Sequence, residues 1–405
     1  MTIISLRFRI KSNMDKIDDL LTRGVEEVLP SKARLAKLMK EKRITLYQGF
    51  DPSMPSLHLG NLVGVMKLRQ FQKLGHKVIF LVGDFTGMIG DPTDKLAVRK
   101  QLTREKVLEN AKNWKNQIKN LLTFDGDNPV EIKFNSEWND KISFKDLIDI
   151  TSNFTVQQMI ERDMFQARIK VGKPIFLHEF LYPVAQGYDF VAMDVDLEIG
   201  GNDQLFNMMA GRSLMKAMKG KEGYVLATKL LVDKEGNKVG KTSGNALFLS
   251  SGPEEFYGGI MSIPDQVIEL AFELLTEEKP EGLSEKIRQN PFLQKKRLAI
   301  EIVRLVWGKM EAQKAQENFD KVFSQRELPS SIPEHFLPSK KLPLLELISS
   351  TQLVKSNSEA KRLIKQGAIV VSGKTINNPR QEIDITDWVH LKIGKRKFAK
   401  VKYSQ

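Results

Sequence analysis

The sequence of 405 residues contains no cysteine. This absence excludes disulfides, zinc or iron–sulfur sites held by Cys, and a thiol nucleophile. The sequence also lacks an apolar run of about eighteen residues, the length that predicts a membrane-spanning helix. Its opening, MTIISLRFRIKSN, has neither a truly apolar core nor a small-residue cleavage site, so it does not predict a secretory signal. These absences favour a cytoplasmic protein whose chemistry comes from other groups.

Acidic residues are scarce toward the C-terminus. The chain carries 63 Lys and Arg against 50 Asp and Glu, a net charge of +13. The last 66 residues, Lys340 to Gln405, hold 14 basic and 5 acidic residues, a surplus of nine positive charges. This concentration is typical of a surface that binds a polyanion, although a solvated basic tail has the same composition.

The length predicts two or three domains, because 405 residues exceed what one hydrophobic core usually serves. A strand at 43–50, a helix at 58–76 and a strand at 77–85 make a βαβ unit. This unit predicts an α/β, Rossmann-like domain over 1–250, with a parallel sheet and a ligand crevice at the carboxyl ends of its strands. Helical periodicity from about 95 to 180 predicts a helical insertion before the sheet resumes near 196–199. Residues 1–13 are expected to be a flexible extension, unless Met14 is the true start.

The remaining sequence predicts three further parts. Residues 251–325 have only helical periodicity and predict an α-helical domain. Residues 326–343 contain four prolines, too many for a helix or a central strand, and predict a semi-rigid linker. Residues 344–405 predict a small α+β domain with two short helices, a hairpin in GAIVVSGKTI and a final strand, WVHLKI.

Polar and flexible residues gather where the first strand meets its helix. Asp51 and Ser53 lie in the loop, and His58, Gly60 and Asn61 open the helix. A helix N-terminus presents N–H groups and partial positive charge to an anion. Gly60 lets a nucleotide approach the backbone, while His58 and Asn61 can donate hydrogen bonds to phosphate and ribose. By itself, HLGN also fits an ordinary helix start.

A second group lies in NKVGKTSGN, residues 237–245. Lys238 and Lys241 flank Gly240 and precede Thr242. Two lysines three residues apart in a glycine-containing loop can close over a polyphosphate and neutralise departing pyrophosphate. A solvated surface turn has the same local pattern, so this motif gains weight only together with the first.

HLGN and KVGKT, in this order and about 180 residues apart, resemble the two signatures of class I aminoacyl-tRNA synthetases, usually written HIGH and KMSKS. The segments LYQGFDPSMPSLHLGN, VGDFTGMIGDPT, EFLYPVAQGYD, DLEIGGNDQ and KVGKTSGN together resemble bacterial-type tyrosyl-tRNA synthetases. Asn61 replaces the last His of HIGH, and Val239 and Thr242 depart from KMSKS. The resemblance implies a ligase that makes tyrosyl-adenylate and pyrophosphate from tyrosine and ATP. It then transfers tyrosyl to the 3′-terminal adenosine of tRNA(Tyr).

The resemblance also implies a tyrosine pocket. It assigns Tyr47 and Asp189 to the phenol oxygen, and Asp91, Tyr182 and Gln186 to the substrate ammonium. The spacing of Tyr182, Gln186 and Asp189 places them on one face of a helix, although Pro183 and Gly187 interrupt the pattern. Tyrosyl-tRNA synthetase is the standard case in which such a pocket rejects phenylalanine without editing.

For ATP, the resemblance places Ser53 and His58 at the γ-phosphate, and Lys238, Lys241 and Thr242 at the departing pyrophosphate. With Asn61 these form the predicted catalytic set. The predicted ATP- and adenylate-binding residues are Asp51, Gly60, Gly201, Asp203, Gln204 and Lys241. Mg²⁺ is expected to arrive with ATP, and neither zinc nor a metal site built by the protein is expected.

The C-terminal pattern SNSEAKRLIKQGAIVVSGKTINNP resembles an S4-type RNA-binding module. Lys361, Arg362 and Lys365 lie on its predicted helix and are the expected RNA contacts. The family resemblance further implies that 251–325 binds the anticodon and that the chain forms a homodimer through the inserted region.

Three other interpretations stay open on the sequence. A sister enzyme for tryptophan is disfavoured by Tyr47 with Asp189. A non-catalytic RNA-binding or splicing protein on the same scaffold is disfavoured by His58 and the two lysines. A small nucleotidyltransferase with a similar phosphate site leaves the helical and S4-like regions unexplained.

Overall fold

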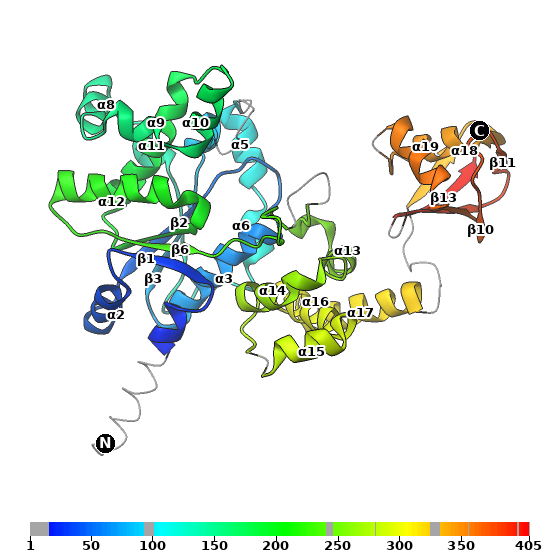
Figure 1. Ribbon diagram of the computed structural model, residues 1–405, viewed down its shortest axis with the longest axis horizontal. Helices are drawn as coiled ribbons and strands as arrows, with labels where there is room; N and C mark the ends of the chain where they lie inside the picture. The colour runs from blue at the N-terminus through cyan, green and yellow to red at the C-terminus, as the bar shows by residue number, and fades with distance from the viewer. Residues whose placement is uncertain are drawn as a thin grey trace, which may run out of the picture. The chain divides into compact units, whose positions relative to one another are not determined.

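The computed structural model describes residues 16–92, 101–239, 246–279, 281–324, 333–354, 356–394 and 397–404. The chain divides into two compact units, Met1–Ala312 and Gln313–Gln405. Figure 1 colours their elements in chain order. Two predicted site residues, Lys241 and Thr242, lie outside the described residues, as does the expected extension 1–13.

A six-stranded sheet forms the centre of the first unit. Its strands, in spatial order, are β1 (Val25–Leu29), β6 (Tyr224–Thr228), β5 (Leu197–Gly201), β2 (Thr45–Phe50), β3 (Lys77–Val82) and β4 (Glu131–Phe134). All neighbours are parallel except β1, which is antiparallel to β6. The predicted βαβ unit is β2, α3 (Leu59–Lys73) and β3, and β5 is the strand expected near 196–199. The predicted fold class is confirmed.

Helices cover both faces of this sheet (Figure 1). On one face, α11 (Leu177–Met193) and α12 (Leu205–Lys219) pack against Tyr47, Ile79 and Leu81. On the other, Gly64 of α3 lies against the Gln48 side chain, and Trp114 of α6 (Trp114–Ile118) packs edge-on against Phe80. Successive strand residues point to opposite faces, so one strand supplies both layers.

Helix α11 continues through Pro183 and Gly187, which interrupt the sequence pattern. At Gly187, a Cβ atom would lie 3.1 Å from the backbone nitrogen of Gly211 in α12. The close approach of these two helices therefore favours glycine at this position. As a result Tyr182, Gln186 and Asp189 share one continuous helix.

The region from 95 to 180 is not purely helical. Its described elements are α5 (Arg104–Ala111), α6, β4, α7 (Ser136–Asn139), α8 (Phe144–Thr151), α9 (Val156–Ile160), α10 (Asp163–Lys170) and the start of α11. Strand β4 pairs in parallel with β3 and extends the sheet. The sequence interpretation missed it because four residues, EIKF, are too short to establish a period of two.

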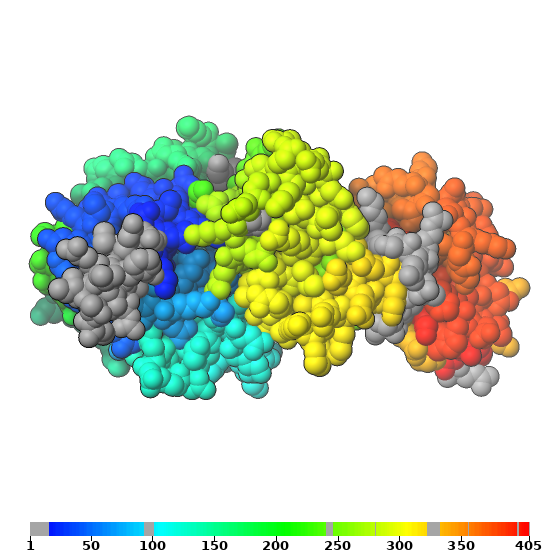
Figure 2. Space-filling view, turned by 90° about the horizontal axis from the view of Figure 1, so that it is seen from below, coloured from blue at the N-terminus to red at the C-terminus, as the bar shows by residue number. Residues whose placement is uncertain are grey.

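Residues from 253 onward form the expected helices: α13 (Pro253–Ile260), α14 (Ile268–Leu275), α15 (Leu283–Gln289), α16 (Pro291–Trp307) and α17 (Lys309–Ser324). Figure 2 shows their yellow-green surface against the blue and cyan parts of the sheet domain. Arg23 donates to the carbonyl oxygens of Phe272 (2.8 Å) and Thr276 (3.0 Å) at the end of α14. Asn120 Nδ2 donates to Val306 O (2.8 Å). These contacts attach α14 and α16 to the segments beside the six-stranded sheet.

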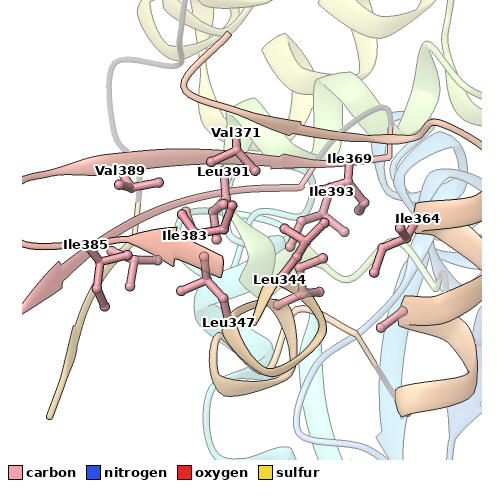
Figure 3. Close-up of a cluster of buried hydrophobic side chains, with 14 residues drawn as sticks. Leu344, Leu347, Ile364, Ile369, Val371, Ile383, Ile385, Val389, Leu391 and Ile393 are labelled. Carbon is pink, nitrogen blue, oxygen red and sulfur yellow. The ribbon is translucent and has the colours of Figure 1, made fainter. Parts of the chain in front are cut away.

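The second unit has its own hydrophobic core. Its strands are β7 (Glu334–Leu337), β8 (Lys341–Pro343), β9 (Ile369–Val371), β10 (Lys374–Thr375), β11 (Glu382–Asp384), β12 (Val389–Ile393) and β13 (Lys397–Tyr403). The five-stranded sheet has the order β10-β9-β12-β13-β7, and β11 pairs with β8. Figure 3 shows Val371, Leu391 and Ile393 directed toward Leu344 and Leu347 of α18 (Leu344–Ser350).

Two expectations for this unit change. WVHLKI corresponds to β12, but it is not the final strand, because β13 follows and pairs with it. The proline-rich segment 326–343 contains β7 and β8 in its described part, so that part belongs to the sheets rather than to a spacer. The predicted hairpin is confirmed: β9 and β10 are joined through Ser372 and Gly373, which have φ of 42° and 86°.

Candidate active site

A cavity of about 710 Å³ opens at the carboxyl ends of β2, β3, β5 and β6. It brings together every small-molecule site residue that the sequence predicts within the described ranges. These residues are Tyr47, Asp51, Ser53, His58, Gly60, Asn61, Asp91, Tyr182, Gln186, Asp189, Gly201, Asp203, Gln204 and Lys238. Residues from positions 47 to 238 therefore share one crevice, at the edge where a parallel α/β sheet binds ligands.

The N-terminus of α3 forms one wall of this cavity. His58 is the N-cap, and its backbone N–H donates to Asn61 Oδ1 (3.0 Å). A Cβ atom on Gly60 would lie 3.0 Å from His58 Cε1, so glycine leaves room for the imidazole. The backbone N–H of Leu59 donates to Leu247 O (2.9 Å), which fixes the helix start against the strand-like segment near Phe248. This wall presents the positive end of a helix dipole to the cavity.

Asp189 lies at the buried end of the cavity. Its carboxylate accepts hydrogen bonds from Asn135 Nδ2 (3.1 Å), Trp138 Nε1 (2.7 Å) and Asn139 Nδ2 (2.9 Å). Burial raises the pKa of Asp189 well above its usual range, and the three donors oppose that rise. Tyr47 is also fully buried, and burial together with nearby Glu198 raises the pKa of its phenol. Tyr47 therefore keeps its proton and can act as a hydrogen-bond donor.

Two further acidic groups, Asp51 and Asp91, line the cavity. Asp51 accepts hydrogen bonds from Tyr182 Oη (2.8 Å) and Thr86 Oγ1 (2.7 Å). Asp91 pairs with Arg162 (3.2 Å) and accepts a hydrogen bond from Gln204 Nε2 (2.7 Å). These contacts hold both carboxylates in place, and the Arg162 guanidinium offsets part of the negative charge of Asp91.

A fourth acidic group, that of Glu198 on β5, lies behind Gln186. Gln186 Nε2 donates to Glu198 Oε1 (2.9 Å). Burial raises the pKa of Glu198 to about 7, opposed by the hydrogen bond from Gln186 and by the nearby Tyr47 phenol. With its amide nitrogen engaged by Glu198, Gln186 can present its carbonyl oxygen to a cationic ligand.

Lys238 lies on a short hairpin that follows β6. Val232 and Lys238 form a β-bridge, and Asp233 Oδ1 accepts the backbone N–H of Asn237 (2.8 Å) in the turn. Lys238 Nζ pairs with Asp203 Oδ2 at 2.5 Å across the cavity. The hairpin therefore brings a lysine directly to the carboxylate expected at the adenylate ribose.

Sequence reasoning missed several groups that hold the predicted residues. They are Thr86, Asn135, Trp138, Asn139, Arg162 and Glu198. Asn135 follows β4, which the sequence did not reveal, and no short motif marks Trp138 or Arg162. Within the described ranges, no three His, Cys, Asp or Glu side chains are grouped to hold a metal ion. In the same ranges, no helix is both long and apolar enough to span a bilayer.

Comparison with known families adds to this geometry. The family described as tRNA synthetases class I (W and Y) matches residues 39–324, and the S4 domain matches residues 342–389. The tyrosine–tRNA ligase of Aquifex aeolicus is 39% identical over 94% of this chain and 97% of its own length. That of Carboxydothermus hydrogenoformans is 41% identical over 95% and 97%.

Solved structures share the fold. A truncated mitochondrial tyrosyl-tRNA synthetase of Aspergillus nidulans superposes with a TM-score of 0.64 at 24% identity, covering 76% of this chain and 94% of that one. The tyrosyl-tRNA synthetase of Archaeoglobus fulgidus, solved with L-tyrosine, gives 0.58 at 22% identity, covering 75% and 99%.

Proposed function

The chain belongs to the class I tRNA synthetases for tryptophan and tyrosine, and we propose that its pocket selects tyrosine through Asp189 and Tyr47. The chain is a tyrosine–tRNA ligase: it forms tyrosyl-adenylate from tyrosine and ATP and transfers tyrosyl to tRNA(Tyr). The observation that carries the specificity is a buried carboxylate with three fixed donors at the closed end of the cavity.

In this proposal the phenol of tyrosine donates to Asp189, while Tyr47 completes the hydrogen-bond network. An analogue without the hydroxyl leaves these buried groups unsatisfied, and such a loss is costly. Tyr182 Oη and the Gln186 carbonyl oxygen accept hydrogen bonds from the substrate ammonium. Asp91, which a hydrogen bond from Gln204 holds in place, adds a negative charge to this ammonium site. The indole of tryptophan offers no hydroxyl for the same end of the pocket.

ATP occupies the wall formed by α3. We place its phosphates at Ser53, His58 and Asn61. Gly60 lets the nucleotide approach the protein backbone closely, and Asp51 lines the same part of the cavity. The ribose lies at Gly201, Asp203 and Gln204. Lys238, with Lys241 and Thr242 outside the described residues, neutralises the leaving pyrophosphate. Mg²⁺ enters as the ATP complex and is held chiefly by phosphate oxygens and water. The tyrosine carboxylate attacks the α-phosphate directly, so the protein accelerates the reaction by positioning the substrates and stabilising the developing charge.

Replacing Asp189 with Asn tests the pocket. In the variant, an amide group replaces the carboxylate, and its NH2 cannot accept hydrogen bonds from the three donors or from the phenol. Tyrosine-dependent exchange of pyrophosphate into ATP should therefore fall by at least about 100-fold. Asp194→Asn is the matched control, because Asp194 ends the same helix in a left-handed conformation that Asn tolerates. Normal exchange in Asp189→Asn would show that the phenol is recognised elsewhere.

The C-terminal unit supplies RNA contacts in this proposal. Lys361, Arg362 and Lys365 all lie on α19 (Asn357–Lys365), whose apolar side packs into the core through Ala360 and Ile364. The basic residues can therefore contact phosphates while the helix stays anchored. Residues 251–325 are proposed to approach the anticodon, and the protein is proposed to act in the cytoplasm.

We also propose a homodimer through the inserted region. Large apolar side chains are exposed along α8 to α11, and two of them, Phe144 and Leu177, have 79% of their surface exposed. The others are Ile148, Val156, Ile169, Val171 and Phe176. An apolar surface of this kind marks an interface in soluble proteins. Sedimentation should show a dimer that Leu177→Asp converts to a monomer, whereas Leu293→Asp on α16 leaves the dimer intact.

A further inference from the structure

The C-terminal unit carries aromatic and basic side chains on the face of its sheet that points away from its helices. Along β12 and β13, Leu391, Ala399 and Val401 are buried in the core with α18 and α19. Strand residues alternate between faces, so their neighbours Lys400 and Lys402 point outward. Figure 3 shows Leu391 on the helix side. The outward set forms a separate surface.

Cross-strand register brings this outer set together. Lys402 pairs with Phe336 of β7, and Lys400 pairs with both Glu334 of β7 and His390 of β12. Phe336 is 59% exposed, although an edge strand does not need a large aromatic there. Its ring lies edge-on to Trp388, with centroids 5.4 Å apart. We call Phe336, Trp388, His390, Lys392, Phe398, Lys400 and Lys402 the outer sheet face.

Lysines lie over the aromatic rings of this face. Lys400 Nζ and Lys402 Nζ are each 5.8 Å from the Trp388 ring centroid, and Lys392 Nζ is 5.7 Å from that of Phe398. Two acidic groups lie at the edge: Glu334 is 3.8 Å from Lys400 and Asp387 is 3.6 Å from Lys402. Three lysines against these two carboxylates, both partly solvated, leave the face basic.

We propose that the outer sheet face binds unpaired nucleotides of the tRNA, with bases stacking on Phe336 and Trp388 and phosphates meeting the lysines. An open sheet with exposed aromatic rings and interleaved cations is suited to single-stranded RNA, because every base offers a π-face and every linkage a negative charge. This inference rests on the proposed RNA-binding function. It adds a second surface on the side of the sheet opposite α19.

The two surfaces differ in what they can recognise. The lysines and arginine of α19 can contact phosphates of a duplex by shape, without access to bases. Phe336 and Trp388 require bases that are free to stack. Full-length protein should therefore bind a 12-nucleotide single-stranded RNA through the outer sheet face and a 12-base-pair RNA duplex mainly through α19.

The test measures the affinity of full-length variants for tRNA(Tyr) transcript and for these two RNA probes. Phe336→Ala and Trp388→Ala should weaken binding of tRNA and of the single strand by roughly 5- to 150-fold, the value of one stacked base. Their dependence on salt should stay unchanged, because no phosphate contact is lost. Trp388→Phe keeps an aromatic ring and should retain most of the affinity. Because Phe336 is so exposed, its replacement does not threaten folding.

Lys402→Ala and Lys374→Ala form a matched pair. Lys374 is exposed in the same unit but pairs across the strands with the inward Val371, so it lies off the outer sheet face. Only Lys402→Ala should weaken RNA binding and lower the salt slope, by up to about one unit. The proposal is overturned if Phe336→Ala and Trp388→Ala both bind tRNA and single-stranded RNA as tightly as the parent does. That result would also be expected if a protein, rather than RNA, occupied this face. Tyrosine-dependent pyrophosphate exchange and duplex binding by α19 variants, measured in parallel, report on the proposed function separately.

Discussion

Glu198 is a buried carboxyl group that touches two residues of the tyrosine pocket. Burial raises its pKa from 4.5 to about 7. The folded protein therefore holds a proton there that the unfolded chain releases between these values. Glu198 contributes its full stability below pH 4.5, and this contribution is lost as pH rises through about 7. The difference amounts to about 3 kcal/mol at 1.36 kcal/mol per pKa unit.

Glu198→Gln should remove this pH dependence. The free energy of unfolding of the variant, minus that of the parent, should rise by about 2–3 kcal/mol when the pH is raised from 4.5 to 8.5. Urea denaturation at the two pH values measures the gain. Glu26→Gln, at an exposed position on β1, is the control and should track the parent at both. If the difference in unfolding free energy between Glu198→Gln and the parent is the same at both pH values, the Glu198 carboxyl is ionised in the folded protein at pH 4.5 as well as at pH 8.5.

Lys238 must leave one partner to reach another. Lys238 pairs with Asp203, whereas the proposed reaction needs Lys238 at the pyrophosphate and Asp203 at the ribose. Lys238→Ala should lower the single-turnover rate of adenylate formation by roughly 100-fold, because charge stabilisation is lost mainly in the transition state. The dissociation constant for tyrosine should stay within about twofold. A variant that raised KM alone would contradict this assignment.

Many of the residues that line the cavity were predictable, because they belong to short motifs at the ends of the strands and in the helices beside them. Tyr47 lies in β2, and Asp51 and His58 follow that strand in the same segment. The groups that support Asp189 were not predictable. Asn135 and Trp138 reach it from a region whose short strand and one-turn helix leave no periodic signal. Nothing local distinguishes them from surface polar residues.

At the scale of elements, α14 is joined to the catalytic sheet through its C-terminal end. Arg23 donates to the carbonyl oxygens of Phe272, Glu273 and Thr276, and Glu273 in turn accepts hydrogen bonds from Gly24 N and Lys229 Nζ. A helix end has carbonyl groups without partners inside the helix, and a guanidinium satisfies several at once. Lys229 begins the hairpin that carries Lys238, so α14 also supports the base of that hairpin.

Arg23→Ala should therefore destabilise the first unit by about 1–3 kcal/mol, since buried carbonyl groups lose a charged donor. Chemical denaturation measures the change. Arg34→Ala, at an exposed position on α2 (Lys32–Glu41), provides the control and should stay within about 0.5 kcal/mol of the parent. If both variants have the same free energy of unfolding as the parent, Arg23 does not act as a cap of α14.

The elements that sequence analysis located are those with long or repeated patterns. Helix α3 and the strands beside it were found because their apolar spacing is clear over 43–85. β13 was missed because KFAKVKY shows lysines on its outward face, which resembles a solvated tail. β7 was missed because prolines surround it, yet an edge strand tolerates neighbouring proline.

We expect the two units to have different roles, the first in activating tyrosine and the second in binding tRNA. The first unit contains the entire described cavity, and the second has a separate core and most of the basic surplus. Deleting residues 325–405 should leave tyrosine-dependent pyrophosphate exchange within about twofold of the parent, while charging of tRNA(Tyr) falls by at least about 100-fold at 150 mM salt. Both rates are measured on the same preparation. Equal loss of the two activities would contradict this division.

In the proposed function, one cavity activates tyrosine and excludes phenylalanine and tryptophan. Exchange of labelled pyrophosphate into ATP, measured for each of the twenty amino acids without tRNA, tests this selectivity. We expect exchange with tyrosine, and rates for phenylalanine lower by up to roughly 10⁵, the discrimination known for this class of pocket. Comparable exchange with phenylalanine or tryptophan, or none with tyrosine, would contradict the role of Asp189 and Tyr47.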